Sequence, residues 1–284
     1  MNHPIQPARW SMLPVAGDQG AMTRNPPSHP AIGSASLFLW HGRALVVGPG
    51  IDSIPHAHFA AQITVALERP FRVRLDAGSP WISTQAAIFA PNQMHQLDCG
   101  GAMLAHLFVD SPQCRQAISS VCDAGYCQGP EFSEVMAALQ TARQSRLDID
   151  AAERAAKRWL DCAVPQAVEP AALDPRISAA LAWIGDHPGE TVTGESLAVQ
   201  AHLSESRFTH LFRQQTGLPL SRYLLWSRLL WAVEAVAGGE DLTAAAHIAG
   251  FADLAHMSRT FRGTFGVVPS ELRKMTIAFK REGQ

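Results

Sequence analysis

The C-terminal part of the chain contains the same helical unit twice, 49 positions apart. The first copy begins at Ser206 and the second at Ala255. In each copy two apolar residues, an arginine and a glycine stand at the same four positions. The equivalent pairs are Phe208 with Met257, Phe212 with Phe261, Arg213 with Arg262, and Gly217 with Gly266. We expect each copy to be a short helix, a turn and a second helix that fits a DNA groove, so the doubling predicts a protein that holds a duplex at two places.

The region around the two copies carries clear signals for the starts and ends of helices. Asp174 is a good N-cap, and Pro175 follows at the first helical position, where its missing N–H costs nothing. Ser204 and Asp253 are placed to cap the two repeated helices, and the glycine behind each copy supplies the left-handed residue that commonly ends a helix. A long apolar helix over about 220–237 is expected to join the copies.

The charge of this region is balanced, although its arginines are concentrated. Residues 174–284 hold 11 Lys+Arg and 11 Asp+Glu, and the whole chain has a formal net charge of -2. Non-specific attraction to phosphates should therefore be modest. The arginines on the two repeated helices are Arg207, Arg213, Arg259 and Arg262. Their placement, rather than the net charge, indicates a nucleic-acid partner.

These residues resemble the signature of AraC/XylS-type transcription regulators. The stretch 242–270, LTAAAHIAGFADLAHMSRTFRGTFGVVPS, carries the match, and 203–217 resembles the first helix-turn-helix of that family. The resemblance covers about 174–275. It implies an all-α domain of seven helices over 174–284, with helix-turn-helix motifs at about 194–215 and 242–265. The two reading helices would then enter successive major grooves on one face of promoter DNA.

The resemblance also implies which side chains contact DNA. Arginine can bind guanine bidentately, Ser and Thr can reach any base, and Ala can meet a thymine methyl group. Leu254 and Ala255 stand where polar residues are frequent in the family, so Arg259 and Arg262 are expected mainly to grip phosphates. The expected DNA-binding residues are Ser206, Thr209, His210 and Arg213 in the first helix, and Leu254, Ala255, His256, Arg259 and Arg262 in the second.

The N-terminal half has a β pattern from about 36 to 110. Short apolar runs recur between turn signals such as Gly48-Pro-Gly50 and Asp76-Ala-Gly78. The runs are 37–40, 44–47, 62–67, 71–75, 86–89 and 103–109. Many short strands at this spacing predict a small antiparallel sandwich or barrel. Residues 1–35, with many Pro, Gly and Ser, are expected to be a disordered tail.

Residues 111–163 are expected to be a helical region that mediates self-association or contacts the DNA-binding domain. Apolar residues recur at helical spacing around 132–139, and 151–162 is Ala-rich and amphipathic. Residues 164–173 contain two prolines and no periodicity, which is typical of a linker between domains. The fold class predicted for the whole chain is α+β.

A group of histidines resembles the two half-motifs of a cupin barrel, a domain that AraC-type regulators often carry as a sensor. His56 and His58 form a His-x-His pair, Gln62 follows, and His95 ends the second half-motif. Metal-binding cupins bring such a pair, a nearby acid and a later histidine to one ion, and imidazoles suit Zn, Cu, Fe or Ni. Alternate residues of a strand face one side, so His56 and His58 should both point inward. The expected pocket residues are His56, His58, Gln62, His95 and His106, the last two on strands across the barrel.

The acid of that ligand set is missing, because Gln62 takes its place. A divalent transition metal and an organic effector bound among the same side chains both stay open, as does a purely structural role. Trp40 and Trp81 are candidates for apolar walls of such a pocket. A cupin oxygenase would keep a complete facial metal site, so the incomplete set argues against an enzyme.

The patterns together predict an effector-responsive transcription regulator in the bacterial cytoplasm, associated with the nucleoid when bound to DNA. The family makes activation through RNA polymerase contact the expected mode. No apolar run approaches the roughly 18 residues that span a bilayer, no secretory signal is found, and five scattered cysteines fit a reducing compartment. Two rival interpretations remain open: a metal-dependent cupin enzyme with an attached DNA-binding domain, and an effector-independent DNA-binding protein whose barrel serves only oligomerisation, for example as a homodimer.

Overall fold

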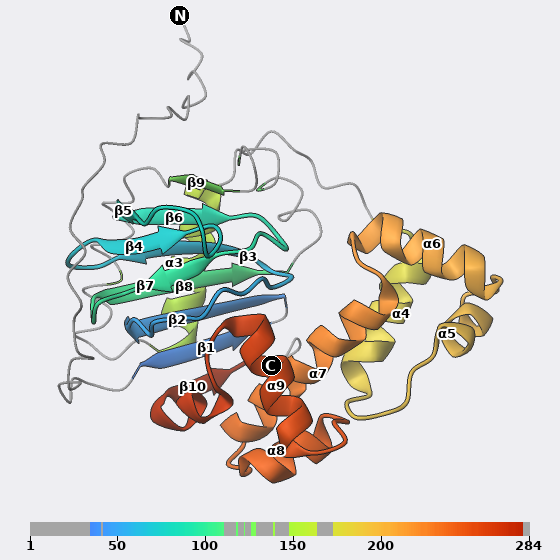
Figure 1. Ribbon diagram of the computed structural model, residues 1–284. Helices are drawn as coiled ribbons and strands as arrows, with labels where there is room; N and C mark the ends of the chain where they lie inside the picture. The colour runs from blue at the N-terminus through green and yellow to red at the C-terminus, as the bar shows by residue number, and fades with distance from the viewer. Residues whose placement is uncertain are drawn as a thin grey trace, which may run out of the picture.

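A computed structural model of the chain describes residues 35–40, 42–110, 148–163 and 173–280, together with residues 118, 122, 126–128 and 139. A β-rich N-terminal domain lies beside a helical C-terminal domain (Figure 1). The α+β class predicted from the sequence is therefore confirmed. The expected tail over 1–35 and linker over 164–173 lie, but for their last residues, outside the described part of the chain.

The described strands form two sheets. A seven-stranded sheet has the order β10-β1-β2-β8-β3-β6-β9, and a three-stranded sheet has the order β5-β4-β7. The strands are β1 (Ser36–Trp40), β2 (Arg43–Pro49), β3 (Ala61–Ala66), β4 (Phe71–Arg74), β5 (Ile82–Thr84), β6 (Ala86–Phe89), β7 (Gln96–Asp98), β8 (Met103–Val109), β9 (Tyr126–Gln128) and β10 (Thr276–Phe279). All six apolar runs are strands, whereas β5, β7, β9 and β10 were not predicted.

The closed barrel that the sequence suggested is not formed by the described strands. Closure requires every strand to be hydrogen-bonded on both sides, but the larger sheet ends at β9 and β10. β3 ends at Ala66, and bends at residues 67–69 followed by Pro70 separate it from β4. The two strands join different sheets, and an isolated bridge between His56 and His95 links the loop before β3 to the start of β7.

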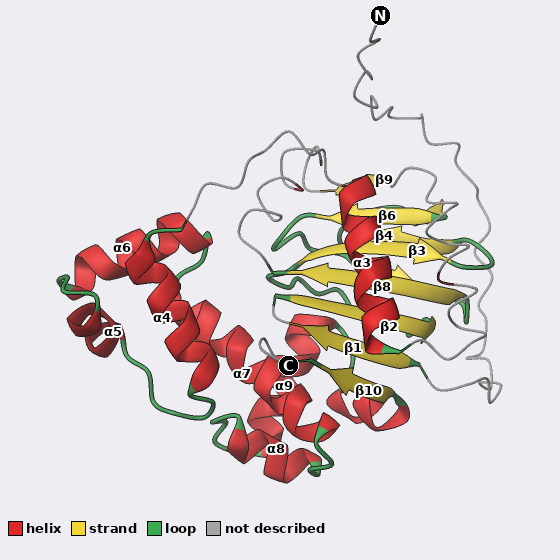
Figure 2. Cartoon of the chain, turned by 180° about the vertical axis from the view of Figure 1, so that it is seen from behind, coloured by secondary structure: helices red, strands yellow, loops and turns green. Residues whose placement is uncertain are grey.

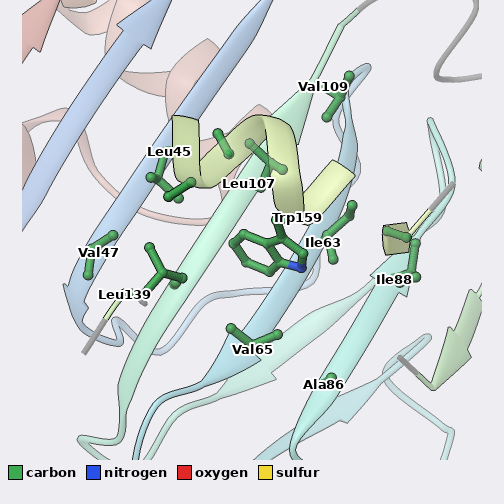
Figure 3. Packing of buried hydrophobic residues seen from close by; sticks show 14 of the residues in the cluster. Leu45, Val47, Ile63, Val65, Ala86, Ile88, Leu107, Val109, Leu139 and Trp159 are labelled. Carbon is green, nitrogen blue, oxygen red and sulfur yellow. The ribbon is translucent and has the colours of Figure 1, made fainter. Parts of the chain in front are cut away.

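Strands of the larger sheet send alternate side chains to opposite faces. One face is covered by α3 (Ile149–Ala163), which crosses the strands in Figure 2 and begins and ends close to the predicted 151–162. Trp159 of α3 is wholly buried among Leu45, Ile63 and Leu107 (Figure 3). Alanines on the same side of α3 allow its backbone to approach the sheet closely.

The opposite face of the same sheet packs on the smaller sheet at β3, β6 and β8, and on the helical domain at β1 and β2. Leu37 and Leu39 of β1 belong to the hydrophobic core of that domain, and Ala44 and Val46 of β2 pack against it. The C-terminal strand β10 pairs with β1 in parallel, the one parallel pair among the described strands. The two domains therefore share a core and a sheet edge.

The helical domain confirms most of the predicted helix ends. Six α-helices and one 3-10 helix lie within residues 173–280, so the expected seven are reached only by counting the 3-10 helix. They are α4 (Pro175–Asp186), α5 (Gly194–Gln200), α6 (Glu205–Thr216), α7 (Leu220–Ala237), α8 (Leu242–Ile248), α9 (Leu254–Phe265) and the 3-10 helix η2 (Pro269–Lys274). Asp174 accepts a hydrogen bond from the Arg176 N–H, as an N-cap does, with Pro175 as the first helical residue. Across the described residues, no helix combines the length and apolarity that crossing a membrane requires.

Candidate functional site

The first repeated helix is α6, the second helix of a helix-turn-helix with α5. The Ser204 side chain accepts a hydrogen bond from the Arg207 N–H at 3.4 Å, which satisfies one free donor of the first turn. Gly217 ends the helix at φ 76°, a conformation that glycine adopts without strain. Phe208 and Phe212 are fully buried, so they fix which side of α6 faces outward.

The second repeated helix, α9, is built in the same way. Asp253 Oδ1 accepts a hydrogen bond from the His256 N–H at 2.6 Å, and Gly266 ends the helix at φ 72°. Met257 and Phe261 are buried at the positions equivalent to the two phenylalanines of α6. The long helix α7 runs between the two units (Figure 1). The duplication seen in the sequence is thus a duplication of structure.

The outward residues of both helices are largely open to a partner. Ser206, His210 and Arg213 of α6 and Ala255, Arg259 and Arg262 of α9 are exposed. Three of the predicted DNA-binding residues are half-buried: Thr209, Leu254 and His256. Thr209 donates its hydroxyl hydrogen to the Glu205 carbonyl at 2.9 Å, and Leu254 packs against the core of the domain. These two have less of their side chain available for a base than the arginines have.

The exposed arginines of α6 and α9 are not neutralised by neighbours. Arg207, Arg213, Arg259 and Arg262 make no ion pair with another described residue. By contrast, Arg176 of α4 is paired with Asp174. Guanidinium groups that keep all their donors free suit the planar, bidentate recognition of phosphate or guanine.

The predicted pocket histidines come together where the two domains meet. His56, His58 and His95 are buried, and their potential ligand atoms lie within 4.8 Å of one another. The ring centroids of His56 and His95 are 4.2 Å apart. Two expectations were wrong: His56 and His58 lie in the irregular segment between β2 and β3, and His95 stands directly before β7, so none of the three is within a strand. The side chains of His56 and His58 still lie together, with ring centroids 5.7 Å apart.

All three histidines of this cluster have one ring nitrogen fixed by the backbone. His56 Nδ1 is 2.9 Å from the Ile54 carbonyl oxygen, His58 Nδ1 is 2.8 Å from that of Ala60, and His95 Nδ1 is 2.8 Å from that of Gln93. Carbonyl oxygens only accept, so each Nδ1 carries the hydrogen. The lone pair of each neutral ring is then on Nε2.

Gln62 and His106 extend this cluster along the sheet. Gln62 Oε1 is 2.7 Å from His58 Nε2, and its amide nitrogen donates to Thr64 Oγ1 at 2.8 Å. Thr64 Oγ1 lies 2.9 Å from His106 Nδ1. Thr64 and His106 are direct cross-strand partners of β3 and β8. His106 is thus a neighbour of the three-histidine group and not one of its members.

Burial keeps these imidazoles neutral. It lowers the pKa of His56 to about 4, with a further contribution from His58, and lowers the pKa of His106 to about 4, with contributions from His56 and His58. Burial also lowers the pKa of His58, and it lowers that of His95 well below the usual value with help from the two neighbouring rings. Neutral imidazole is the form that binds metals.

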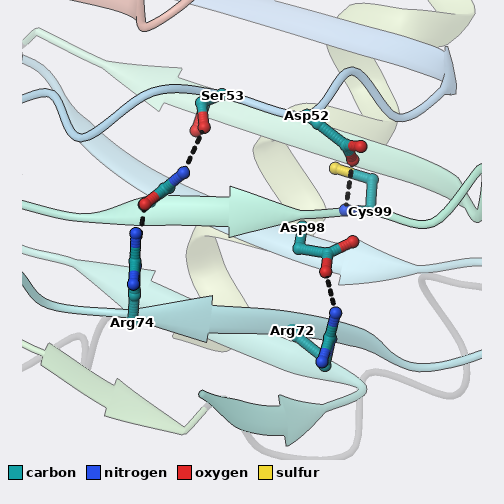
Figure 4. Close-up of polar contacts among 7 residues, drawn as sticks. Asp52, Ser53, Arg72, Arg74, Asp98 and Cys99 are labelled. Carbon is teal, nitrogen blue, oxygen red and sulfur yellow. Dashed lines mark hydrogen bonds and ion pairs between the residues drawn. The ribbon is translucent and has the colours of Figure 1, made fainter. Parts of the chain in front are cut away.

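The loop that carries His56 is held firmly to the three-stranded sheet (Figure 4). The Gln96 amide donates to the Ser53 carbonyl at 2.8 Å, and Arg74 donates to Gln96 at 2.7 Å. Asp52 Oδ1 accepts from the Cys99 N–H at 2.8 Å. These bonds set the position of His56 relative to β7 and hence to His95.

A cavity of about 190 Å³ lies between the domains. From the N-terminal domain it is lined by His56, His58, Gln62 and His106 and by apolar residues that include Trp40, as suggested. Trp81, the other suggested wall, lies instead beside Arg72 and Arg74 of the smaller sheet, with its ring 4.6 Å from the Arg74 guanidinium. The helical domain contributes Trp226, Leu230, Phe261, Phe265 and Met275. A ligand in this cavity would touch both domains.

The end of α9 meets the histidine cluster directly. The Ile54 N–H donates to the Gly266 carbonyl at 3.0 Å. A Cβ atom on Gly266 would lie 2.5 Å from His56 Nδ1 and 2.8 Å from Ser53 Cβ. Position 266 therefore requires glycine for two reasons: its φ is positive, and a side chain there would collide with the other domain.

The helical-domain side of this site was missed by sequence reasoning. Trp226 donates its indole hydrogen to Asp110 Oδ2 at 2.6 Å, and it packs with Phe59 and Ala60 across the interface. An apolar position on a central helix has the same pattern whether it faces its own domain or another. Only the tertiary structure distinguishes the two cases.

Comparisons with known proteins bear on the C-terminal domain first. A family model described as a helix-turn-helix domain matches residues 197–275. The HTH-type transcriptional activator RhaS of Escherichia fergusonii is 37% identical over 102 residues, which are 36% of this chain and 37% of that protein. RhaS of Citrobacter koseri is also 37% identical over 102 residues, with the same coverage. The similarity thus spans little more than a third of the relatives' length.

The whole fold has counterparts among solved structures. ToxT from Vibrio cholerae O395 matches with a TM-score of 0.50 at 10% identity, covering 83% of this chain and 99% of that chain. A second structure of this ToxT, bound to (E)-4-(8-methylnaphthalen-1-yl)but-3-enoic acid, matches with a TM-score of 0.52 at 10% identity, covering 85% and 99%. The two-domain fold is therefore shared with ToxT. Residues 197–275 are an AraC/XylS-type helix-turn-helix domain, which this chain joins to a β-rich N-terminal domain.

Proposed function

We propose that this protein is an effector-responsive transcription regulator, acting as an activator, that reads two successive major grooves with α6 and α9. The observation that carries the proposal is the pair of equivalently capped helices, each with buried aromatic or apolar residues on one side and unpaired arginines on the other. The similarity to proteins named transcriptional activators over this same region supports it.

The outward side chains divide into base readers and phosphate contacts. Ser206, His210 and Arg213 of α6 offer hydrogen bonds to base edges. On α9, Ala255 offers only a methyl group near the start of the helix, so Arg259 and Arg262 carry most of its interaction with DNA, chiefly through phosphates. The first helix is therefore proposed to contribute more of the sequence preference.

Binding to duplexes selected from a random-sequence pool tests these roles. Arg213→Ala is expected to weaken binding to the selected site by about 1–3 kcal/mol, with less loss on unrelated DNA. Arg259→Ala should weaken both and lower the salt dependence. Arg158→Ala removes the same charge from an exposed position of α3 that makes no ion pair with another described residue, and serves as the matched control. Equal affinities for all three variants and the wild type would refute the assignment.

The effector site is proposed to be the cavity between the domains. Its walls are mainly apolar, and its lining also includes His56, His58, Gln62 and His106 and a few charged side chains, so a compact, mostly apolar molecule with a polar group fits best. Because both domains line it, an effector would favour one arrangement of the domains over others by binding it more tightly. The ToxT complex with a naphthalenyl butenoic acid shows that a protein of this fold binds such a molecule.

A ligand screen by thermal shift tests this part, because a compound that binds the native state raises the Tm. Val46→Phe would fill the cavity from β2, and it is expected to abolish the shift while DNA binding remains. A ligand that shifts this variant as much as the wild type would place the effector site elsewhere.

Further parts of the proposed function rest on the family resemblance. Activation would proceed through contact with RNA polymerase on the promoter, in the bacterial cytoplasm. Residues 36–110 would form the sensor, 174–284 the DNA-binding domain, and 111–163 the region of self-association. The mode of regulation is tested by transcription from a promoter that carries the selected site, with and without the protein.

A further inference from the structure

We propose that His56, His58 and His95 bind one divalent transition-metal ion at the seam between the domains. The three side chains are buried at 4%, 3% and 1% exposure, and their potential ligand atoms lie within 4.8 Å of one another. This inference concerns the N-terminal domain and does not depend on the proposed reading of DNA.

The orientation of the rings suits an ion. Each Nδ1 donates its hydrogen to a backbone carbonyl, so each Nε2 has a free lone pair. Histidines that bind metals are usually fixed in this way, with the second ring nitrogen donating to a carbonyl or carboxylate. The backbone carbonyls thus stabilise the Nδ1–H tautomer of all three histidines, which leaves each Nε2 able to bind a metal.

The strongest single indication is His95. Its Nε2 is buried and has no hydrogen-bond partner among the described residues. The ring is stacked on Phe89, with centroids 4.2 Å apart, so it cannot turn outward to water without breaking that contact. A buried polar atom without a partner is destabilising. A bound cation would supply the missing partner.

Gln62 is the neighbour of this group. Its amide lies 2.7 Å from His58 Nε2 and 2.8 Å from Thr64 Oγ1. With its nitrogen toward His58 the amide donates to the free lone pair of that ring, and with its oxygen toward His58 it offers a further, weak ligand to an ion bound there.

Size and chemistry favour zinc-like ions. Bonds from a metal to imidazole nitrogen are about 2.0–2.1 Å, which places neighbouring ligand nitrogens roughly 3.4 Å apart in a tetrahedral site. Small side-chain rotations would bring nitrogens that lie within 4.8 Å to that spacing. Three imidazoles suit Zn²⁺, Cu²⁺, Fe²⁺ or Ni²⁺ rather than Mg²⁺ or Ca²⁺, which prefer oxygen. His56 and His58 also line the cavity, so the remaining position would be open to water or an anionic oxygen.

The site lies against the end of the second repeated helix. His56 contacts Gly266. Ile54 links the two as well, because its carbonyl accepts from His56 Nδ1 and its N–H donates to the Gly266 carbonyl. An ion that fixes His56 would therefore also fix the place where α9 meets the N-terminal domain.

Metal titration of the tag-free, full-length protein tests the proposal. After treatment with a chelator, the protein is titrated with Zn²⁺ in a calorimeter, and with Co²⁺ to follow its visible absorption. We expect one ion per chain and a Co²⁺ spectrum of a four- or five-coordinate site. His95→Ala should weaken binding by roughly tenfold or more. His247→Ala, an exposed histidine of α8, should bind like the wild type.

A gain-of-function variant separates ligand loss from misfolding. Gln62→Glu introduces a carboxylate next to His58, and it is expected to bind Zn²⁺ more tightly than the wild type because a carboxylate is a stronger ligand than an amide. Zn²⁺ should also raise the Tm of the wild type and of Gln62→Glu, but not that of His95→Ala. No saturable binding in the wild type, or equal binding by the wild type and a folded His95→Ala, would overturn the proposal. Neither result would bear on DNA recognition.

Discussion

Replacing Gly266 by alanine tests whether the N-terminal domain is really docked against the second reading helix. Gly217 and Gly266 end α6 and α9 at nearly the same φ, 76° and 72°. Their surroundings differ. A Cβ on Gly217 would meet nothing within 4 Å, whereas a Cβ on Gly266 would lie 2.5 Å from His56 Nδ1. Gly217→Ala is therefore a matched control that carries the same backbone strain without the contact.

The two substitutions should differ by the energy of overpacking. A left-handed conformation costs an alanine about 1–2 kcal/mol, and both variants bear that cost. Gly266→Ala must in addition displace His56 and Ser53, whose loop is held by several hydrogen bonds to the smaller sheet. Overpacking of this kind costs typically about 1–3 kcal/mol. The expected losses are about 1–2 kcal/mol for Gly217→Ala and about 2–5 kcal/mol for Gly266→Ala.

Urea unfolding of the full-length variants, followed by tryptophan fluorescence and circular dichroism, measures both losses. Fluorescence is informative because Trp226 lies in the interface. Gly266→Ala should also move that signal at low urea if the domains separate to relieve the contact. The reasoning fails if Gly266→Ala is no more destabilising than Gly217→Ala.

Two further changes test the core and the buried histidines. Phe212→Ala should lower the free energy of unfolding by about 3–5 kcal/mol, since the ring is wholly buried beside Phe208 and Tyr223; Arg213→Ala, exposed on the same helix, should change it by no more than about 0.5 kcal/mol, and similar losses would contradict the assigned faces. The chelator-treated protein should lose stability as the pH falls from about 6.5 to about 4, because burial lowers the pKa of His106 to about 4 and the unfolded chain takes up the proton first. His106 contributes at most about 3 kcal/mol to this loss. A His106→Gln variant should therefore show a weaker pH dependence of unfolding, and the full wild-type dependence would be incompatible with that assignment.

The sequence was most informative where structure depends on local interactions. The N-caps at Asp174, Ser204 and Asp253 and the C-terminal glycines Gly217 and Gly266 are each set by a few neighbouring residues, and all are observed as predicted. The strands with strong apolar runs were found for the same reason. The candidate DNA-binding side chains remain predictions, although the arginines among them are exposed.

What the sequence did not predict depends on contacts between distant residues. The pairing of β10 with β1, the open sheets and the cavity walls from Trp226 and Phe265 all require knowing how the domains meet. The three histidines were grouped through the resemblance to the cupin half-motifs and do lie together, but the contact of His56 with Gly266 links residues 210 positions apart. No local pattern records such a contact.

Selection of binding sites by the full-length protein tests the central claim, that α6 and α9 read two grooves on one face of a duplex. From a random-sequence pool, the wild type should enrich duplexes with two conserved blocks whose centres lie about 10 base pairs apart. Arg213→Ala should relax the preference in one block, and Arg259→Ala should weaken the contribution of the other. A single conserved block, or the loss of the same positions in both variants, would contradict the account.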